Sequence, residues 1–488
     1  MNTGAPWPSF DEAWRRVLEI QTKLHRWAGE DGSRRFDDLF NLVTDPAFLM
    51  VAWDRVRSNT GSRSAGVDGL TAHHLQVLVG AEPFMGMIRE AVRSGQFRPL
   101  PVRERMIPKP GSLKKRRLGI PTVADRVVQA SLKLVLEPIF EADFHPCSFG
   151  FRPRRRAQDA IADIHLLASK SYEWILEADI EACFDSIDHV ALMARVRRRV
   201  GDRRVLSLVK AFLKAGILTE AGSREETHTG TPQGGILSPL LANIALSVLD
   251  DFAQHAWQTA MSTKGLRAKR RRHGQPNWRL VRYADDFVIL VHGDRRDAEQ
   301  LRDEVAVVIA GMGLRLSPPK TMVVHIDEGF DFLGFRIQRH RKRGTGRRCV
   351  YTYPSKKAVT AIKDKVRALT HSSAQADLTA LLERVNGVLR GWSNYFKHGV
   401  SKRTFSYLGA FTWRRTAIWI RKRHKGLTWK HLRRRFMAGG WTITDGQFTL
   451  FNPASVTVSR YRRRSVIPNP WTPPTRRLTG LPQIIGFL

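Results

Sequence analysis

Two adjacent aspartates, Asp285 and Asp286, lie between two apolar-rich segments, and a third, Asp179, ends another apolar run 106 residues earlier. Carboxylates that gather in a protein core repel one another and need a partner cation. Two divalent metal ions would satisfy them, and such a pair supports nucleotidyl transfer by activating the attacking hydroxyl and stabilising charge on the phosphoryl group. Because an all-oxygen ligand shell suits Mg²⁺, the three aspartates predict a site for two magnesium ions.

Other side chains in the sequence suit the handling of a nucleotide. Lys109 and Arg116 lie seven residues apart on a predicted hairpin and could neutralise a triphosphate. Phe184 follows the third aspartate by five residues and could lie under a sugar, and Gln233 precedes two glycines that let backbone approach a base pair. Each of these residues also has a simpler interpretation as surface charge, core or a helix-start loop. Similarly, an isolated Asp-Asp pair more often caps a turn.

The elements that must position these residues follow from the apolar pattern. Residues 174–180 are expected to form a buried strand, residues 279–292 a β-hairpin around the aspartate pair, and residues 331–335 a short strand. Residues 8–60 and 124–140 show helical spacing. If the strand end and the hairpin turn are neighbours in one sheet, the three carboxylates meet.

The charge of the chain is large and unevenly distributed. Lys and Arg total 81 against 45 Asp and Glu, which gives a net charge of +36. Residues 336–488 hold 33 of the basic side chains and only four of the acidic ones. Nucleic acid is the usual partner of such charge. A solvated surface or an anionic membrane is the alternative, but Trp, Tyr and Phe interleave with the basic residues and can stack on bases.

Several classes of protein are excluded by simpler features. No stretch reaches the roughly 18 apolar residues of a membrane span, and the first residues show no secretory signal. The three cysteines, Cys147, Cys183 and Cys349, are widely spaced, which indicates a reducing compartment without disulfides. Their spacing also excludes a Cys-x-x-Cys zinc site, including a zinc-stapled nuclease module.

Several motifs resemble, in their order, the blocks of reverse transcriptases. These are Asp179 to Phe184, Gln-Gly-Gly-Ile-Leu-Ser-Pro (233–239), Tyr-Ala-Asp-Asp (283–286), Leu-Ser-Pro-Pro-Lys-Thr (316–321) and Phe-Leu-Gly-Phe (332–335). A second set resembles group II intron-encoded proteins more closely, namely residues 66–69, 105–109, 118–122, 148–153 and 178–189. Leu-Arg-Gly-Trp-Ser-Asn-Tyr-Phe (389–396) resembles the signature of their maturase region. The resemblance covers about residues 50–440.

The resemblance implies an α+β fold of the right-hand polymerase type, in which fingers and an antiparallel palm sheet precede an α-helical thumb that is the maturase domain. The domains expected are a helical N-terminal extension (1–60), fingers and palm (61–335), a basic linker (336–355), the thumb (356–438) and a basic, DNA-binding-like tail (439–488). Helix breaks are expected near Gly399 and Gly426.

The resemblance also assigns roles to residues of the site. Asp179, Asp285 and Asp286 would be the catalytic metal ligands, together with Ile180. Lys109 and Arg116 would hold the triphosphate of a deoxynucleotide, Phe184 its sugar, Gln233 the nascent base pair and Lys320 the primer side. The family usually has Arg-Pro where this chain has Arg116-Arg117, so Arg117 could share or replace the role of Arg116.

The basic last third is expected to bind nucleic acid. Trp392 and Trp419 are predicted to be core residues, and the tail arginines 462–464 and 476–477 resemble a DNA-contacting extension. The arginines expected to face phosphates are Arg414, Arg415, Arg421, Arg423, Arg433, Arg434 and Arg435. The implied partners are group II intron RNA, template RNA, a DNA primer or target DNA, and deoxynucleoside triphosphates, without a membrane.

The function that follows is RNA-directed DNA polymerisation together with intron splicing and intron mobility (retrohoming), in the bacterial cytoplasm in association with RNA and the nucleoid. Two alternatives stay open at this point. One is an RNA-binding splicing cofactor that makes little use of its polymerase site. The other is a reverse transcriptase that has been domesticated or diverted to another role.

Overall fold

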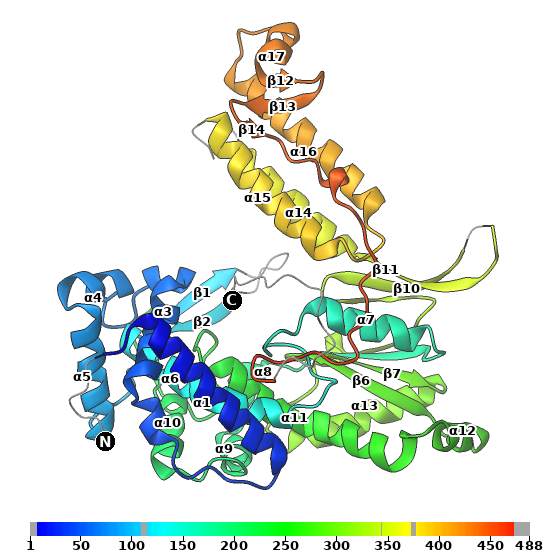
Figure 1. The fold of residues 1–488 in the computed structure, drawn as a ribbon. Helices are drawn as coiled ribbons and strands as arrows, with labels where there is room; N and C mark the ends of the chain where they lie inside the picture. Colours follow the sequence, from blue (N-terminus) through cyan, green and yellow to red (C-terminus); the bar gives the residue numbers. More distant parts are fainter. Residues whose placement is uncertain (1–6, 109–114, 343, 372–376, 473–488) are drawn as a thin grey trace.

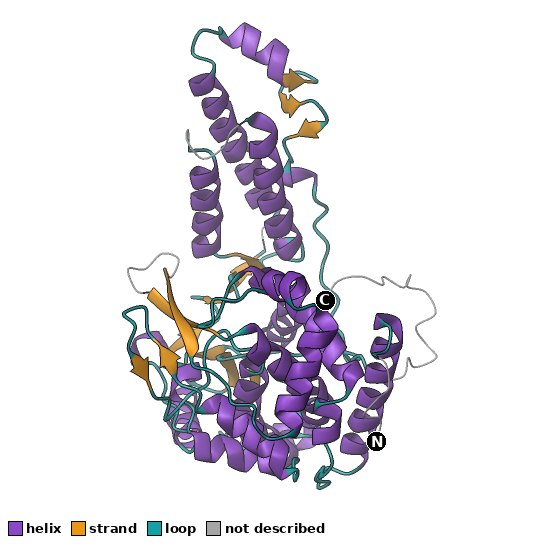
Figure 2. Cartoon of the chain, turned by 90° about the vertical axis from the view of Figure 1, so that its left-hand side faces the viewer, coloured by secondary structure: helices purple, strands orange, loops and turns teal. Residues whose placement is uncertain are grey.

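A computed structural model describes residues 7–108, 115–342, 344–371 and 377–472. A broad body built of helices and sheets carries a group of long helices that rises from it (Figure 1). Figure 2 shows that these long helices run side by side above the body and that one extended segment of chain returns from them. This mixture of helices and antiparallel sheets agrees with the expected fold class.

The N-terminal part is helical, as predicted for residues 8–60. Ser9 and Glu12 form a capping box at the start of α1, which satisfies backbone N–H groups of its first turn. The helices of this part are α1 (Phe10–Glu30), α2 (Phe40–Val43), α3 (Pro46–Ser58), η1 (Thr60–Arg63), α4 (Ala72–Leu78) and α5 (Ala81–Arg93).

A four-stranded sheet in the order β2-β1-β4-β5 forms the fingers. Its strands are β1 (Val102–Pro108), β2 (Lys115–Ile120), β4 (Ile217–Leu218) and β5 (Arg224–Glu225). The pairing of β1 with β2 is antiparallel, so the predicted hairpin is confirmed. Lys109, between these two strands, lies outside the described residues.

Helix α6 (Val123–Asp143) is the central helix of the body and contains Pro138. Proline has no N–H, so the carbonyl of Leu134 lacks its helical donor. The side-chain amide of Gln21 on α1 donates to that carbonyl instead, at 2.7 Å. The backbone group that Pro138 leaves open therefore becomes a contact between α1 and α6.

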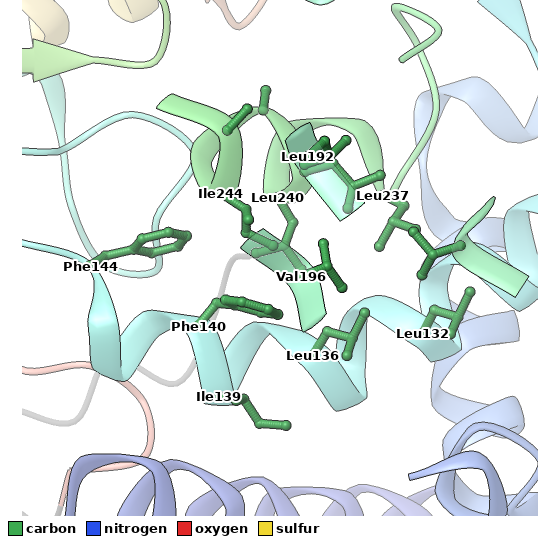
Figure 3. Packing of buried hydrophobic residues seen from close by; sticks show 14 of the residues in the cluster. Leu132, Leu136, Ile139, Phe140, Phe144, Leu192, Val196, Leu237, Leu240 and Ile244 are labelled. Atoms are coloured by element: carbon green, nitrogen blue, oxygen red, sulfur yellow. The ribbon is translucent and has the colours of Figure 1, made fainter. Parts of the chain in front are cut away.

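The main core lies on the other side of α6. Leu136 and Phe140 of α6 pack toward Val196 of α9 (His189–Arg197) and Leu240 and Ile244 of α11 (Ser238–Ala256) (Figure 3). The remaining helices of the body are α7 (Ala157–Ala168), α8 (Cys183–Ser186), α10 (Arg203–Leu213), the π-helix η2 (Trp257–Met261), α12 (Lys264–Arg272), α13 (Arg295–Ala310) and η3 (Pro318–Lys320).

The palm sheet has the order β6-β7-β3-β8 and is antiparallel throughout. Its strands are β3 (Trp174–Ala178), β6 (Asn277–Tyr283), β7 (Asp286–His292) and β8 (Met322–His325). Residues 287–291 of β7 are all buried. Both faces of the sheet are therefore covered, which explains why the sequence of β7 is continuously apolar rather than alternating. The predicted strand at 174–180 and the hairpin at 279–292 are confirmed.

The segment expected to be a basic linker, residues 336–355, contains a β-hairpin. Strands β9 (Phe330–Phe332), β10 (Phe335–Arg341) and β11 (Arg348–Pro354) form a three-stranded antiparallel sheet. The buried side chains of Ile337 and Val350 belong to the same core cluster as the palm strands. Likewise, the short strand expected at 331–335 is the end of β9, a turn, and the start of β10.

The thumb is a group of helices broken near Gly399 and Gly426, as predicted. They are α14 (Lys356–Leu369), α15 (Leu378–Phe396), α16 (Lys402–Arg423) and α17 (Trp429–Phe436), and the break after Leu369 was not foreseen. Three short strands, β12 (Met437–Ala438), β13 (Thr442–Asp445) and β14 (Phe448–Thr449), follow α17. None of the helices in the described ranges is long and apolar enough to cross a membrane.

The segment after β14 runs from the thumb back to the body; we call residues 453–472 the return segment. It begins with η4 (Pro453–Ser455). Arg463 and Arg464 form ion pairs with Asp163 and Asp159 of α7. Trp471 then donates from its indole N–H to Gln21 of α1 at 3.2 Å. Two arginines expected to contact DNA are thus engaged within the protein, while residues 476–477 lie outside the described residues.

Candidate active site

The three predicted metal ligands lie at one edge of the palm sheet. Ala178 of β3 pairs with Phe287 of β7, so Asp179 and Asp286, each one residue beyond that pair, follow at the same edge. Tyr283 pairs with Asp286 and closes a two-residue turn of Ala284 and Asp285. The sheet thereby brings together carboxylates that are 106 residues apart in the chain.

The turn of Ala284 and Asp285 has an unfavourable backbone conformation that buried side chains hold in place. Ala284 has φ = 58°, in the left-handed region that residues with a Cβ rarely adopt. Arg282 donates from Nη1 to the carbonyl of Ala284 at 2.9 Å and to Oδ1 of Asn243 at 3.0 Å. Arg282 also forms a two-point ion pair with Asp250, and both side chains are fully buried. Breaking such a pair typically costs about 3–5 kcal/mol, so it anchors the turn.

The motif at 148–153 supports the same turn from the other side. The Asn243 amide donates to the carbonyl of Gly150 at 2.9 Å. A Cβ on Gly150 would lie 2.2 Å from the backbone nitrogen of Ala284, so only glycine allows this contact. Arg152 fixes the loop through a buried ion pair with Glu141. The motif at 148–153 therefore helps to hold the turn in its conformation.

Four supporting residues were not identified from the sequence: Gly150, Asn243, Asp250 and Arg282. The available signal was Arg282 itself, one of two arginines in β6, because a buried guanidinium needs a carboxylate partner. The sequence does not reveal that this partner lies on α11, 32 residues earlier.

The electrostatics of the site reflect its crowded carboxylates. Burial raises the pKa of Asp286 to about 6, with further raising by Asp285 and Asp179 and an opposing effect of Lys320 and Arg116. Burial also raises the pKa of Asp285, again with a contribution from Asp179. Neighbouring carboxylates thus oppose the ionisation of Asp285 and Asp286, an effect that a bound cation would reverse.

Lys320 lies beside Asp179. Its ammonium group is 2.8 Å from Oδ2 of Asp179. In the described part of the chain, no three His, Cys, Asp or Glu side chains converge closely enough to hold a metal ion as they stand. In this arrangement the negative charge of Asp179 is paired with the ammonium group of Lys320.

Ile180 follows Asp179 in an isolated bridge with Leu316. The hydrogen bonds of this bridge come from neighbouring residues, Glu181 N–H to Arg315 and Ser317 N–H to the carbonyl of Asp179. In such a non-hydrogen-bonded antiparallel pair, the carbonyl of Ile180 points away from Leu316. The carbonyl of Ile180 therefore takes no part in the hydrogen bonds of this bridge.

The side chains of Arg116 and Arg117 have different surroundings in the structure. Arg117 lies 2.6 Å from Glu104 and 2.6 Å from Glu225, so it is engaged within the finger sheet. Arg116 is exposed on β2, and it acts against the burial that raises the pKa values of the two turn aspartates. Arg116 is therefore the guanidinium that faces the carboxylates.

Gln233 lies where the fingers meet α11. Its carbonyl accepts a hydrogen bond from Gly119 of β2 at 2.7 Å. Gly234 has φ = 115°, and a Cβ there would lie 2.5 Å from the carbonyl oxygen of Gly119. Glycine at position 234 thus lets its backbone lie against that of Gly119. The sequence predicted a close approach to a base pair, whereas the partner in the structure is the finger strand β2.

Phe184 lies on α8, directly after the strand that ends at Asp179. Its ring is half-buried and makes an edge contact with the exposed ring of Phe151, with centroids 6.3 Å apart. Part of the ring is therefore exposed.

The arginines expected to bind nucleic acid lie on the thumb helices α16 and α17. Those with exposed side chains are Arg414, Arg421, Arg423, Arg433, Arg434 and Arg435. Arg415 is half-buried and donates to Thr370 at 3.0 Å. Trp419 is buried, as predicted, whereas Trp392 is half-buried against the core.

Comparison with known proteins identifies the class to which this site belongs. Residues 107–337 match the family model described as reverse transcriptase (RNA-dependent DNA polymerase). Residues 359–437 match the model for the maturase-specific domain of group II introns. The expected right-hand polymerase fold with a helical maturase thumb is therefore confirmed, and the chain is an RNA-directed DNA polymerase.

Individual relatives narrow the class to a family. The chain is 36% identical to Protein YkfC of Escherichia coli over 72% of its own length and 97% of the relative. It is 31% identical to the group II intron-encoded protein LtrA of Lactococcus lactis, over 68% of its own length and 61% of LtrA. The chain belongs to the reverse transcriptase and maturase family of group II intron-encoded proteins.

Proposed function

We propose that this reverse transcriptase works with two Mg²⁺ ions held by Asp179, Asp285 and Asp286, with the carbonyl of Ile180 as a further ligand. The observation that supports the proposal is that the register of β3, β7 and β6 places Asp179, Asp285 and Asp286 at the same end of the palm sheet. The donor set fits the ion, because it consists of oxygen atoms only and its crowded charges need a cation. When bound, the ions would activate the primer hydroxyl and stabilise charge on the phosphoryl group.

The residues around the carboxylates would orient the substrates. We assign the triphosphate to Lys109 and Arg116, the sugar to Phe184, the nascent base pair to Gln233 and the primer side to Lys320. The position of Arg116 opposite the carboxylates and the exposed part of the Phe184 ring support these assignments. Lys320 would leave Asp179 when a metal ion binds, because a divalent ion is the stronger partner.

The thumb would bind the phosphates of group II intron RNA and seat the template RNA with its DNA primer. Six of the seven predicted arginines are exposed there, which supports this assignment. Splicing of the intron and its movement into target DNA (retrohoming) would follow from the two activities together. We place this work in the bacterial cytoplasm, where the intron RNA is made.

The catalytic assignment is tested with Asp285→Asn. This variant should lose primer extension on an RNA template in Mg²⁺, because the metal site loses a charged ligand, while its affinity for RNA stays near that of the unchanged chain. Extension is measured in single-turnover assays and affinity by filter binding. Asp303→Asn, at an exposed carboxylate of α13, is the control and should extend normally. Normal extension by Asp285→Asn would refute the assignment.

The thumb assignment is tested by replacing Arg433, Arg434 and Arg435 with Ala. Each lost phosphate contact reduces the slope of log affinity against log salt by roughly 0.7–0.9, so the triple variant should bind RNA with a slope reduced by about 2–3. The control replaces three arginines of α13, namely Arg295, Arg296 and Arg302. An equal slope in the thumb variant and the unchanged chain would show that these arginines do not contact phosphates.

A further inference from the structure

A second cluster of cations lies at the end of the palm sheet that is remote from the carboxylates. Arg279 of β6 is four residues before Tyr283, the last residue of the strand, and a strand rises about 3.3 Å per residue, so Arg279 is roughly 13 Å from the turn that carries Asp285. Figure 1 shows helix α12 beside this end of β6 and β7, away from α8. A pocket of about 570 Å³ lies here, within the usual size range of ligand sites.

The lining of this palm-end pocket is strongly basic. It includes Lys170 after α7, Arg267 and Arg271 of α12, Arg279 of β6 and Arg463 of the return segment. No aspartate or glutamate is among the described residues that line it. Asp163 forms an ion pair with Arg463 and so offsets one of the five charges. Asp163 also attracts Arg279, so one carboxylate near the described lining stands against five cations.

Arg279 is the most informative member of the cluster. Its side chain is half-buried, and it makes neither a hydrogen bond nor an ion pair with any described residue. Its guanidinium lies 3.9 Å from the ring centroid of Trp257, and Arg267 lies over the same ring at 5.1 Å. Burial lowers the pKa of Arg279, which means that its charge is held at a cost to folding. An anion in the pocket would offset that cost.

The chemistry of the pocket selects the ligand. Guanidinium groups donate several hydrogen bonds in a fixed fork that matches phosphate oxygens. The one indole ring of the lining is already covered by two guanidinium groups, so it offers little surface for a base. We propose that this pocket binds the phosphodiester backbone of an RNA strand, without reading its sequence, as a contact separate from the polymerase site and the thumb.

The test uses two exposed residues of the pocket, in the variant Lys170→Ala/Arg271→Ala. Binding of a structured hairpin RNA to the full chain is measured over a range of KCl concentrations. Losing two phosphate contacts should reduce the slope of log affinity against log salt by about 1–2. The control variant, Arg295→Ala/Arg296→Ala on α13, removes the same charge elsewhere and should keep the slope. An unchanged slope in the pocket variant overturns the proposal.

A second variant separates binding from structural support. Arg279→Gln should weaken RNA binding and, without RNA, raise the thermal midpoint, because it removes a half-buried charge that forms no ion pair with any residue in the described part of the chain. If Arg279 merely packs on Trp257, the variant would instead lower the midpoint and leave the salt slope unchanged, and the proposal fails.

Inorganic tripolyphosphate serves as a second probe, because a free polyphosphate carries the same chemistry as the backbone. If loss of Lys170 and Arg271 abolishes tripolyphosphate binding but leaves the RNA slope unchanged, the pocket binds free polyphosphate and the assignment to RNA is wrong. The variant that replaces Arg433, Arg434 and Arg435 with Ala distinguishes RNA binding by the pocket from RNA binding by the thumb. Its slope change should add to that of the pocket variant, and a thumb variant without effect would refute the thumb assignment alone.

Discussion

Gly150 lies against the backbone of the turn that carries Asp285, and its missing side chain is what allows the contact. The turn needs this support because Ala284 adopts a left-handed conformation, which costs about 1 kcal/mol or more for a residue with a Cβ. Gly150, Asn243, Asp250 and Arg282 surround the turn without being placed to touch a substrate. They are positioning residues.

Gly150→Ala should therefore impair catalysis far more than folding. The new Cβ would meet backbone rather than a flexible side chain, so the turn must shift, and a displacement of about 1 Å typically lowers the rate about 10²-fold. The measurement is kcat for primer extension, together with the thermal midpoint. Gly387→Ala in α15, where a Cβ meets nothing within 4 Å, is the control and should keep full activity. Equal kcat values for the two variants would contradict this role of Gly150.

The sequence indicated the acidic residues of the site better than the residues that hold their turn in place. The aspartates could be predicted because a third carboxylate, Asp179, and the ordered motifs around the pair distinguish it from an ordinary turn. The partners of Arg282 could not, since they lie 32 and 39 residues away on α11 and only the packed fold brings them close. Choosing between Arg116 and Arg117 also required the register of β1 with β2.

Among the elements, helix α6 has a carboxylate whose ionisation works against folding. Asp125, in its first turn, accepts hydrogen bonds from the Thr122 hydroxyl at 2.7 Å and from the backbone N–H of Leu100 at 3.4 Å. Burial nevertheless raises the pKa of Asp125 to about 6. The unfolded chain has a pKa near 3.9 for this group, so the folded state binds the proton more tightly.

This difference predicts a pH dependence of stability. The stabilising contribution of protonated Asp125 is complete below about pH 4 and is lost as the pH rises through about 6; two pKa units correspond to roughly 3 kcal/mol. Asp125→Asn should remove this loss, so its thermal midpoint relative to the unchanged chain should rise between about pH 4 and pH 7. Asp303→Asn at an exposed site is the control. Parallel pH profiles for Asp125→Asn and the unchanged chain would rule out the effect.

The β10–β11 hairpin shows why an element can be missed. Buried Phe335 and Ile337 alternate with more exposed residues, which is the period of a strand. Basic residues and glycines dominate the composition of the segment and hide this alternation. Arg339 is tied to Asp327 and Glu173, and neither partner belongs to the segment itself. The thumb helices, by contrast, were predictable because their apolar positions recur over many turns.

For the molecule as a whole, the return segment joins the thumb, the palm and the N-terminal helix. Tyr461 and Arg464 bond Asp159 of α7, and Asn469 lies 2.7 Å from the ring of His25 on α1. These contacts explain why part of the C-terminal charge is unavailable for DNA. Net charge counted along the sequence could not show this, because it does not reveal which arginines have acidic partners.

Tyr461→Phe/Arg464→Ala should loosen this connection. The variant removes three of the bonds to Asp159, so the return segment should become more accessible while the body stays folded. Limited proteolysis followed by mass spectrometry would show faster cleavage within residues 453–472. Arg460→Ala, an exposed arginine of the same segment, is the control. Equal cleavage rates in both variants would mean that these bonds do not hold the segment.

The contact of Asn469 with His25 spans 444 residues of chain, and this separation has a consequence for biosynthesis. Helix α1 leaves the ribosome well before its partners in the return segment are made. At about 5–20 residues per second, the ribosome needs roughly 20–90 seconds to make the intervening chain. During that interval α1 can pack on α6, but the faces of His25 and Gln21 that later meet Asn469 and Trp471 stay uncovered. The contacts between the return segment and α1 thus form late in synthesis, at a time set by translation rather than by local folding.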